Sequence, residues 1–308
     1  MLRWRRPAVL MLVLFFLSAS GTPSRAQDTA AEGASGIDYS FSYTPVYQFE
    51  TDLDEGGNFD VNRHYLNFDA MHQLNRDLRL GLGLNYGYED WNFDDRTDIA
   101  EASLWSDLHR AGVSLPIFYR VGYEWTLGLT PTVEFSGESG ADFSDSLIYG
   151  GVISAARSFG DNLFLGLGFG IFDELEETVF FPFIVIDWQI SEQFRLANPY
   201  RSGPAGPAGL ELSYAPAETW ELGIGGAYRS LRFRLDDGGA LSDGVVENEF
   251  FVGFLRVGKA LSRSFSLDLS GGFLFNGELA IEDADGNGIG DEDYDPAPFA
   301  ALTFSGEF

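Results

Sequence analysis

Residues 298–308 read P-F-A-A-L-T-F-S-G-E-F, and this stretch decides the fold class. Side chains along a β-strand alternate between two faces. One face of this stretch is apolar and carries Ala300, Leu302, Phe304 and Phe308. The other face is mixed and carries Phe299, Ala301, Thr303, Ser305 and Glu307. The stretch is therefore predicted to be a strand with one apolar face and an aromatic last residue.

The same period of two recurs along the chain from Ile37 onward. Leucines alternate with small or charged residues through 78–86, 163–170 and 265–270. Such alternation indicates strands. In a soluble sheet the polar face meets water, whereas in a membrane barrel the apolar face meets lipid. Alternation alone does not separate these two cases.

The lengths of the connections do separate them. Six short connections are predicted near residues 75–76, 122–123, 160–161, 191–192, 217–218 and 262–263. Longer ones alternate with them, at 50–60, 89–107, 138–145, 173–177, 198–208, 236–243 and 282–295. This order is typical of periplasmic turns and extracellular loops. It predicts an all-β fold, a transmembrane antiparallel up-and-down β-barrel of about 14 strands. Twelve strands is the alternative, because 194–197 is a weak strand and 148–158 alternates poorly.

The first 26 residues have the pattern of a secretory signal peptide. Three arginines precede an apolar stretch at 8–19, and Ser24 and Ala26 stand at the −3 and −1 positions of a cleavage site. No other apolar run approaches the roughly 18 residues of a transmembrane helix. We expect a signal peptide at 1–26, a short periplasmic segment at 27–36 and a barrel at 37–308. An uncleaved anchor is the less favoured alternative.

Composition narrows the classes of function. The chain has no cysteine, so neither a disulfide framework nor thiol chemistry is available. Four of the 19 basic residues leave with the signal peptide, and the remaining 15 face 47 acidic residues, a formal charge of −32. Such a chain repels phosphates, so nucleic acid is not expected as a partner. Trp125, Trp188 and Trp220 lie near predicted short turns, which indicates an aromatic belt at the inner membrane interface.

With its signal peptide, its alternating strands and its terminal Phe308, the chain resembles bacterial outer-membrane β-barrel proteins. The resemblance covers residues 1–26 and 37–308 and is greatest for barrel families without a separate N-terminal plug. It implies location in the cell outer membrane, in contact with lipid and lipopolysaccharide. It also implies that Phe304 and Phe308 belong to the assembly signal read by periplasmic chaperones and the barrel-assembly machinery. Fatty-acid transporters also use fourteen strands, but they carry a substantial N-terminal hatch, whereas only residues 27–36 precede the first predicted strand here.

One loop has the spacing of a metal site. Asp283, Asp285, Asn287 and Asp291 occupy positions 1, 3, 5 and 9 of a calcium-loop pattern, with a glycine at position 6. The stretch resembles D-x-D-x-N-G calcium loops, but Tyr294 stands at position 12, where a bidentate glutamate is expected. Calcium is therefore the one candidate cofactor, and an acidic loop without metal is the alternative.

Charged residues of the predicted lumen form a second candidate site. Alternation assigns four arginines to it: Arg63, Arg79, Arg232 and Arg234. Because acidic residues share the inner face, these charges would either form stiffening ion pairs or build a constriction that selects solutes. Apolar inward positions at Phe181 and Phe183 favour a narrow interior over a wide aqueous channel.

No enzyme activity is expected. The three histidines stand at no metal-ligand spacing. His109 with Asp107 and Ser106 is the nearest approach to a catalytic group, but no defined motif surrounds it.

The sequence thus favours a passive channel or transporter for small molecules. The alternative is a structural or surface-interaction barrel whose acidic loops bind divalent cations at the lipopolysaccharide surface. Acidic residues gather in six stretches of the long loops, which hold 27 of the 47 acidic residues and only one basic residue: 50–60, 89–98, 138–145, 173–177, 236–243 and 282–295. An outer-membrane enzyme is the third and least favoured function.

Overall fold

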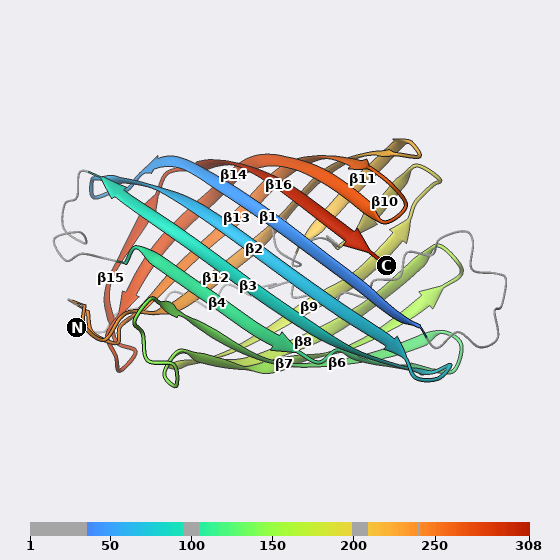
Figure 1. Cartoon of the computed structure of the whole chain (residues 1–308), viewed down its shortest axis with the longest axis horizontal. Coiled ribbons are helices and arrows are strands. Elements are labelled where there is room, and N and C mark those ends of the chain that lie inside the picture. The colour runs from blue at the N-terminus through green and yellow to red at the C-terminus, as the bar shows by residue number, and fades with distance from the viewer. Residues whose placement is uncertain (1–35, 95–104, 199–208, 240) are drawn as a thin grey trace.

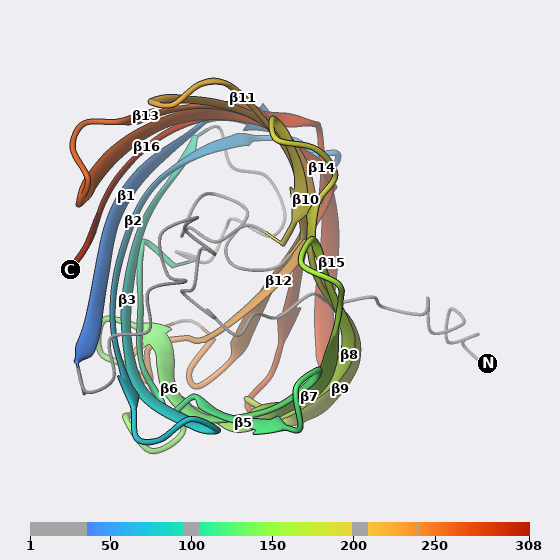
Figure 2. The same cartoon turned by 90° about the vertical axis from the view of Figure 1, so that its right-hand side faces the viewer.

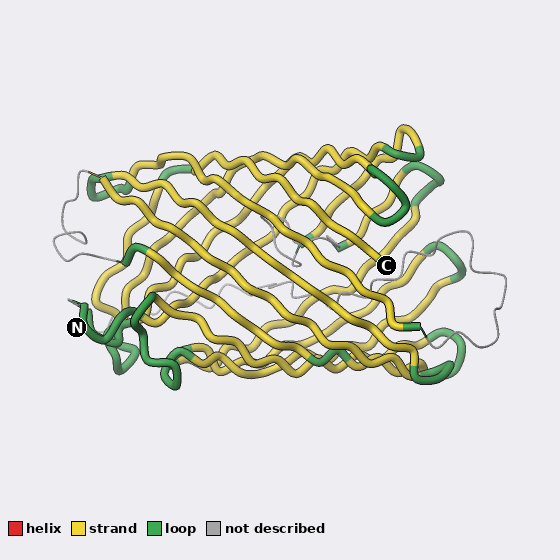
Figure 3. Tube along the Cα trace, viewed as in Figure 1, coloured by secondary structure: helices red, strands yellow, loops and turns green. Residues whose placement is uncertain are grey.

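The computed structural model describes residues 36–94, 105–198, 209–239 and 241–308. In this part of the chain the strands run obliquely around a closed barrel (Figure 1), and loops alone connect them (Figure 3). None of the described residues form a helix that is long and apolar enough to cross a bilayer. The predicted signal peptide, and all of the predicted periplasmic segment except Gly36, lie outside the described residues.

Sixteen β-segments make up the sheet. They are β1 (Ile37–Asp52), β2 (Asn58–Gln73), β3 (Leu78–Asp94), β4 (Asp107–Ser114), β5 (Ile117–Val121), β6 (Trp125–Glu138), β7 (Leu147–Phe159), β8 (Leu163–Glu174), β9 (Glu177–Gln189), β10 (Phe194–Ala197), β11 (Leu210–Ala217), β12 (Trp220–Arg234), β13 (Val245–Ala260), β14 (Phe265–Glu282), β15 (Gly288–Tyr294) and β16 (Ala297–Glu307).

These segments make fourteen strands, because two pairs of segments each act as one strand. β4 and β5 both lie between β3 and β6, and only Leu115 and Pro116 separate them. Pro116 has no N–H to donate, which interrupts the ladder. β15 and β16 both pair with β14 and are separated by Asp295 and Pro296. The predicted fourteen-stranded antiparallel barrel is confirmed.

The terminal strand closes the barrel, as its sequence predicts. β16 pairs with β1 on one side, from Ser40↔Glu307 to Gln48↔Phe299. On the other side it pairs with the turn-proximal half of β14. Phe304 and Phe308 share the outer face with Phe41, whose ring centroid lies 5.7 and 6.3 Å from theirs.

The two faces of the wall differ in the way that a membrane barrel requires. Outward positions on nearly every strand carry exposed apolar side chains, for example Leu82, Ile153, Leu167, Ile224 and Leu255. Soluble monomers rarely expose a continuous apolar surface of this kind, whereas lipid-facing strands do. The three predicted belt tryptophans are also exposed, each close to a short turn.

Short and long connections alternate as predicted, except that the loop-end connection between β8 and β9 is also short. Short turns join strands at the end where β1 begins and β16 finishes, which we call the turn end; the opposite end is the loop end. Two predicted loops at the loop end are wrong in detail. Residues 173–177 form a tight hairpin turn, because β8 and β9 stay paired up to Glu174↔Glu177. Residues 288–294 form β15, because Tyr294 is buried against Phe59.

Candidate functional site

β12 leaves the wall of the barrel before it reaches the loop end. It pairs with β11 up to Leu210↔Gly226, and beyond this point no described strand pairs with that edge until Arg234. The neighbouring strands are short, since β9 pairs with β10 only through Asp187–Gln189. Figure 2 shows β12 crossing the interior of the barrel.

At the loop end β12 reaches β6 on the far side of the lumen. Arg234 and Gly137 form a parallel bridge there. Ser136 Oγ donates a hydrogen bond to the backbone oxygen of Arg232 at 2.6 Å. The Asp236 N–H donates to Glu138 Oε2 at 3.0 Å. Backbone and side-chain bonds together therefore fasten the end of β12 across the lumen.

This contact divides the loop end of the barrel into two compartments. The first, which we call the ring, is enclosed by nine paired segments: β1, β2, β3, β4, β6, β12, β13, β14 and β15. It closes through a bridge between Leu53 and Tyr294. The second, which we call the side compartment, lies between β12 and the inner face of β7, β8 and β9.

The ring is filled with packed side chains. Its apolar cluster includes Phe59, Val61, Trp91, Leu108, Leu231 and Phe233. Arg63 is buried within the ring, and its Nε lies 3.2 Å from Glu89 Oε2. Arg63 Nη1 donates to Gln48 Oε1 at 2.7 Å, and its guanidinium lies 5.4 Å from the Trp91 ring centroid. Arg63 therefore points inward as predicted, but it is enclosed and paired.

A second apolar cluster fills the side compartment. It includes Ile148, Val152, Phe172, Leu175, Phe181 and Phe183, with Val245 of β13. The rings of Phe181 and Phe183 lie across Gly170 and Gly168 of β8, where any Cβ would collide with them. The glycine run of β8 is thus required for this packing. The predicted narrow interior at Phe181 and Phe183 agrees with their burial here.

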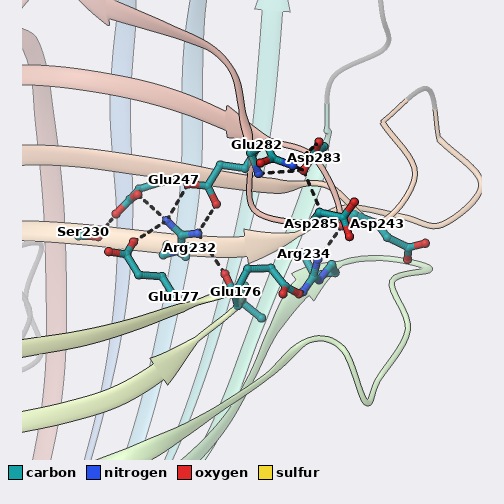
Figure 4. A network of polar contacts seen from close by, with 12 residues as sticks. Glu176, Glu177, Ser230, Arg232, Arg234, Asp243, Glu247, Glu282, Asp283 and Asp285 are labelled. Carbon is teal, nitrogen blue, oxygen red and sulfur yellow. Dashed lines mark hydrogen bonds and ion pairs between the residues drawn. The ribbon is translucent and has the colours of Figure 1, made fainter. Parts of the chain in front are cut away.

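Charged side chains close the side compartment at the loop end (Figure 4). Arg232 is 1% exposed, and it donates from Nη1 to Glu247 at 2.7 Å and from Nη2 to Glu282 at 2.5 Å. Its Nη1 also lies 3.5 Å from Glu177. Nη2 donates in addition to the backbone oxygen of Leu175 at 3.0 Å. A single buried guanidinium therefore holds the β8–β9 hairpin against β13 and β14.

Arg234 binds three of the connections at the loop end. Its Nη2 donates to Glu176 Oε1 at 2.6 Å, in the β8–β9 turn. Its Nη1 donates to the backbone oxygen of Asp243 at 2.6 Å, and its Nε donates to that of Asp145 at 3.0 Å. We call the set Arg232, Arg234, Glu176, Glu177, Glu247 and Glu282 the charged clasp.

The structure places Arg232 and Arg234 differently from a free positive patch in the lumen. Both arginines lie inside the barrel, but the prediction that alternation places them there is wrong. They share the alternation of Leu222 and Ile224, which face outward lower in β12, and they are covered because β12 has left the wall. Acidic partners from β9, β13 and β14 engage them. Arg79 lies near the turn end instead, 3.5 Å from Asp38. Sequence alternation therefore could not show that Arg232 and Arg234 lie together, or which acidic residues they bind.

The β8–β9 turn held by the clasp has an uncommon backbone. Leu175 and Glu176 have φ values of 47° and 71°. A two-residue hairpin turn with two positive φ values normally uses Asn-Gly, and the left-handed conformation costs a non-glycine residue about 1–2 kcal/mol. Leu175 is nevertheless only 4% exposed, because its side chain packs in the side compartment. The bonds from Arg232 and Arg234 offset this strain. The sequence predicts a connection at 173–177, but it indicates neither the two positive φ values nor the burial of Leu175.

The inner face is polar in the middle of the barrel and toward the turn end. Arg110 Nε lies 2.9 Å from Glu134 Oε1, and Asn85 Nδ2 donates to the other oxygen of Glu134 at 2.8 Å. Arg256 pairs with Asp268 at 2.7 Å and also with Glu211 and Glu221. Arg256 was missing from the predicted site, although its alternation along β13 would have indicated an inward position.

The predicted calcium loop is a tight turn between β14 and β15. Asp283 Oδ1 accepts hydrogen bonds from the backbone N–H groups of Asp285 and Asn287. These bonds lower the pKa of the Asp283 carboxyl below its usual value, and the bond from the Asn287 N–H has the largest effect. Asp291 lies on β15, opposite Ala280. Within the described residues, no three histidine or acidic side chains are grouped to hold a metal ion. Calcium binding stays a prediction.

His109 lies on the outer face near the loop end. Its Nε2 lies 2.9 Å from Ser139 Oγ and 3.3 Å from Asp107 Oδ2, and its Nδ1 lies 2.9 Å from the Tyr86 hydroxyl. In a serine hydrolase the acid and the serine engage opposite nitrogens of the histidine. Here they share one nitrogen. Ser106 bonds Asp107 rather than His109, and the sequence did not indicate Ser139.

Comparisons with solved structures find other barrels. The COG4313 outer membrane channel from Pseudomonas putida F1 is 15% identical, with 92% of this chain and 98% of that chain covered and a TM-score of 0.47. The toluene transporter TodX from P. putida is 10% identical, with 90% and 91% covered and a TM-score of 0.45. The KdgM porin is 9% identical, with 87% and 99% covered and a TM-score of 0.33. Similarity this low carries no argument about the function of this chain.

A family model does match most of the chain. No curated protein matches this chain in sequence. The model described as "Domain of unknown function (DUF6268)" matches residues 67–295, which run from β2 to the loop-end side of β16. The chain therefore belongs to the DUF6268 family, and its fold is a fourteen-stranded barrel of the outer-membrane type.

Proposed function

We propose that this protein is a passive channel for small molecules in the outer membrane, exported by the signal peptide at 1–26. One observation carries the proposal. Asn67, Asp69 and Ser154 point into the barrel on the turn-end side, yet they stay partly accessible to solvent. A barrel with a purely structural role has no need of polar, solvent-accessible positions on its inner face. Side chains fill the interior of a barrel of about eight strands, and a fourteen-stranded barrel is wider than that.

The proposed orientation follows from the ends of the strands. β1 begins and β16 finishes at the turn end, which in this class of barrel is periplasmic. The acidic connections then lie outside the cell. The polar half of the lumen would open to the periplasm, and the ring and side compartment would face the exterior. The charged clasp would be the narrowest region of the path.

Two measurements test the proposal. Purified barrel reconstituted into a planar bilayer should give small, discrete conductance steps, because the loop end is filled by side chains. Liposome swelling should show permeation of small neutral sugars that falls steeply with size. A folded barrel that gives neither conductance nor swelling would contradict the proposal.

The packed ring favours a second function, a surface-interaction barrel. An interior closed by an apolar cluster and an acidic rim would serve attachment rather than passage. Divalent cations would then bridge the rim to lipopolysaccharide. Zero conductance together with magnesium-dependent binding to lipopolysaccharide would favour this alternative. We assign no catalytic role to His109.

A further inference from the structure

We propose that solutes cross the loop end through the side compartment and that the β8–β9 hairpin is its gate, an inference that rests on the channel function proposed above. The hairpin turn at Leu175 and Glu176 would swing away from β12 to open the path. The charged clasp would hold it shut.

The two compartments differ in the backbone pairing that encloses them. Every neighbouring pair of segments around the ring shares backbone pairing, including β12 with β6 and β15 with β1. Among the described residues, no such pairing joins β9 to β12. In the described structure, the edge of β9 from Glu177 to Val185 and the edge of β12 from Ala227 to Phe233 pair with no strand. Separating β9 from β12 there breaks no ladder between described strands. β8 stays paired with β7 up to Tyr149↔Asp173, so the part that moves is the hairpin tip beyond Asp173.

Side chains hold the tip of the β8–β9 hairpin in place. Its contacts with β12–β15 at the loop end are side-chain bonds from Arg232 and Arg234, together with the packing of Leu175. Gly286 of the β14–β15 turn also lies against it, since a Cβ on Gly286 would be 3.0 Å from the Glu176 Cβ. Elements that move in gating are drawn from parts of a fold with few backbone constraints.

The position of Leu175 also fits a gate. Its side chain is buried with Ile148, Phe172 and Val245, directly below the clasp. Its backbone oxygen is bound by Arg232, while its φ of 47° is strained. Backbone strain of this kind persists only where surrounding contacts enforce it, and it recurs at switch regions. The Leu175 side chain therefore blocks the side compartment, and Arg232 holds its backbone in place.

A disulfide across the gate tests the inference. The chain has no cysteine, so Glu176→Cys with Gly286→Cys introduces a single pair, at a separation that suits a disulfide after a small adjustment. We expect conductance of the oxidised pair in planar bilayers to fall at least tenfold and to recover on reduction. The single variants control for the positive φ of Gly286.

A matched disulfide away from the gate controls for oxidation itself. Ser266 and Ser305 face each other between β14 and β16 with hydroxyls 2.8 Å apart. Their double cysteine variant should conduct equally when oxidised and when reduced. If the barrel with cysteines at 176 and 286 also conducts equally in both states, the proposed gate is contradicted while the proposed channel function stands.

Removal of the clasp should act in the opposite direction. Arg232→Gln removes the guanidinium that binds the Leu175 backbone oxygen and should raise the open fraction severalfold. Arg157→Gln, which removes an exposed pair with Glu124 near the turn end, should leave the open fraction unchanged. An Arg232→Gln barrel that folds and conducts as the parent does would count against the gate. If no variant and no parent conducts, the channel function itself fails, and the gate fails with it.

Discussion

The backbone of Arg234 pairs in parallel with that of Gly137, although β7 to β11 separate β12 from β6 around the wall. This bridge converts the loop end of a fourteen-stranded barrel into a ring of nine segments. Barrel diameter grows with strand number, and a barrel of about eight strands is narrow enough for side chains to fill it. The loop end can therefore be packed with apolar side chains while the turn-end half stays accessible.

The ring should depend on its aromatic packing. Phe233 is 1% exposed within it, so Phe233→Ala should lower the free energy of unfolding by about 3–5 kcal/mol through lost packing. Denaturant unfolding in lipid vesicles, followed by tryptophan fluorescence, measures this. Leu222→Ala on the outer face of the same strand is the control and should cost less. Equal losses would contradict a packed ring.

The buried pair of Arg63 and Glu89 should behave as a unit. Arg63→Met alone leaves an unpaired carboxylate in the ring and should cost about 3–5 kcal/mol. The double variant Arg63→Met, Glu89→Gln should recover much of that loss, because no unpaired charge remains. Unfolding of both single variants and the double variant gives the coupling. Strict additivity of the two single effects would show that the pair is not coupled.

The terminal aromatic should matter for assembly more than for stability. Phe308 is 62% exposed, and its ring contacts only outer-face neighbours such as Phe41 and Phe265. Phe308→Ala should therefore unfold at nearly the parent's denaturant midpoint but insert severalfold less efficiently in cells. Heat-modifiable mobility of the outer-membrane fraction reports insertion. Phe273→Ala, an exposed aromatic elsewhere on the outer face, should insert as the parent does.

The calcium prediction has a direct test. Calorimetric titration of the folded barrel should give a saturable 1:1 heat if Asp283, Asp285, Asn287 and Asp291 bind the ion. Asp285→Asn should weaken that heat more than Asp237→Asn in the β12–β13 connection. Absence of heat, together with an unchanged melting temperature in calcium, would end the prediction.

The turn at Asp283 should also respond to pH. Backbone N–H groups hold the pKa of Asp283 below its usual 3.8, so its contribution to the turn is complete above that value. As pH falls through the lower folded pKa, the carboxylate is protonated and the contribution is lost. The backbone amide shift of Asn287 should therefore titrate below pH 3.8. The step should be absent in Asp283→Asn.

The sequence by itself determined the wall. Alternation along the strands, the alternating lengths of connections and the terminal strand predicted fourteen antiparallel strands closed by residues 298–308. These signals suffice because the face of a strand is a local property of period two. Burial of Arg63 on the inner face was predictable for the same reason, although its partner Glu89 was not among the predicted site residues.

Only the tertiary structure decided how the loop end closes. In β12, Leu231 and Phe233 face the ring while Arg232 and Arg234 face the side compartment, so all four are buried. Period-two alternation assigns one face to lipid, and it has no means of showing that a strand has left the wall. That departure depends on the shortness of β10 and β11 and on partners 50 and 57 positions away, Glu282 and Leu175. Such contacts join segments far apart in the sequence, and the alternation of residues within one strand carries no information about them.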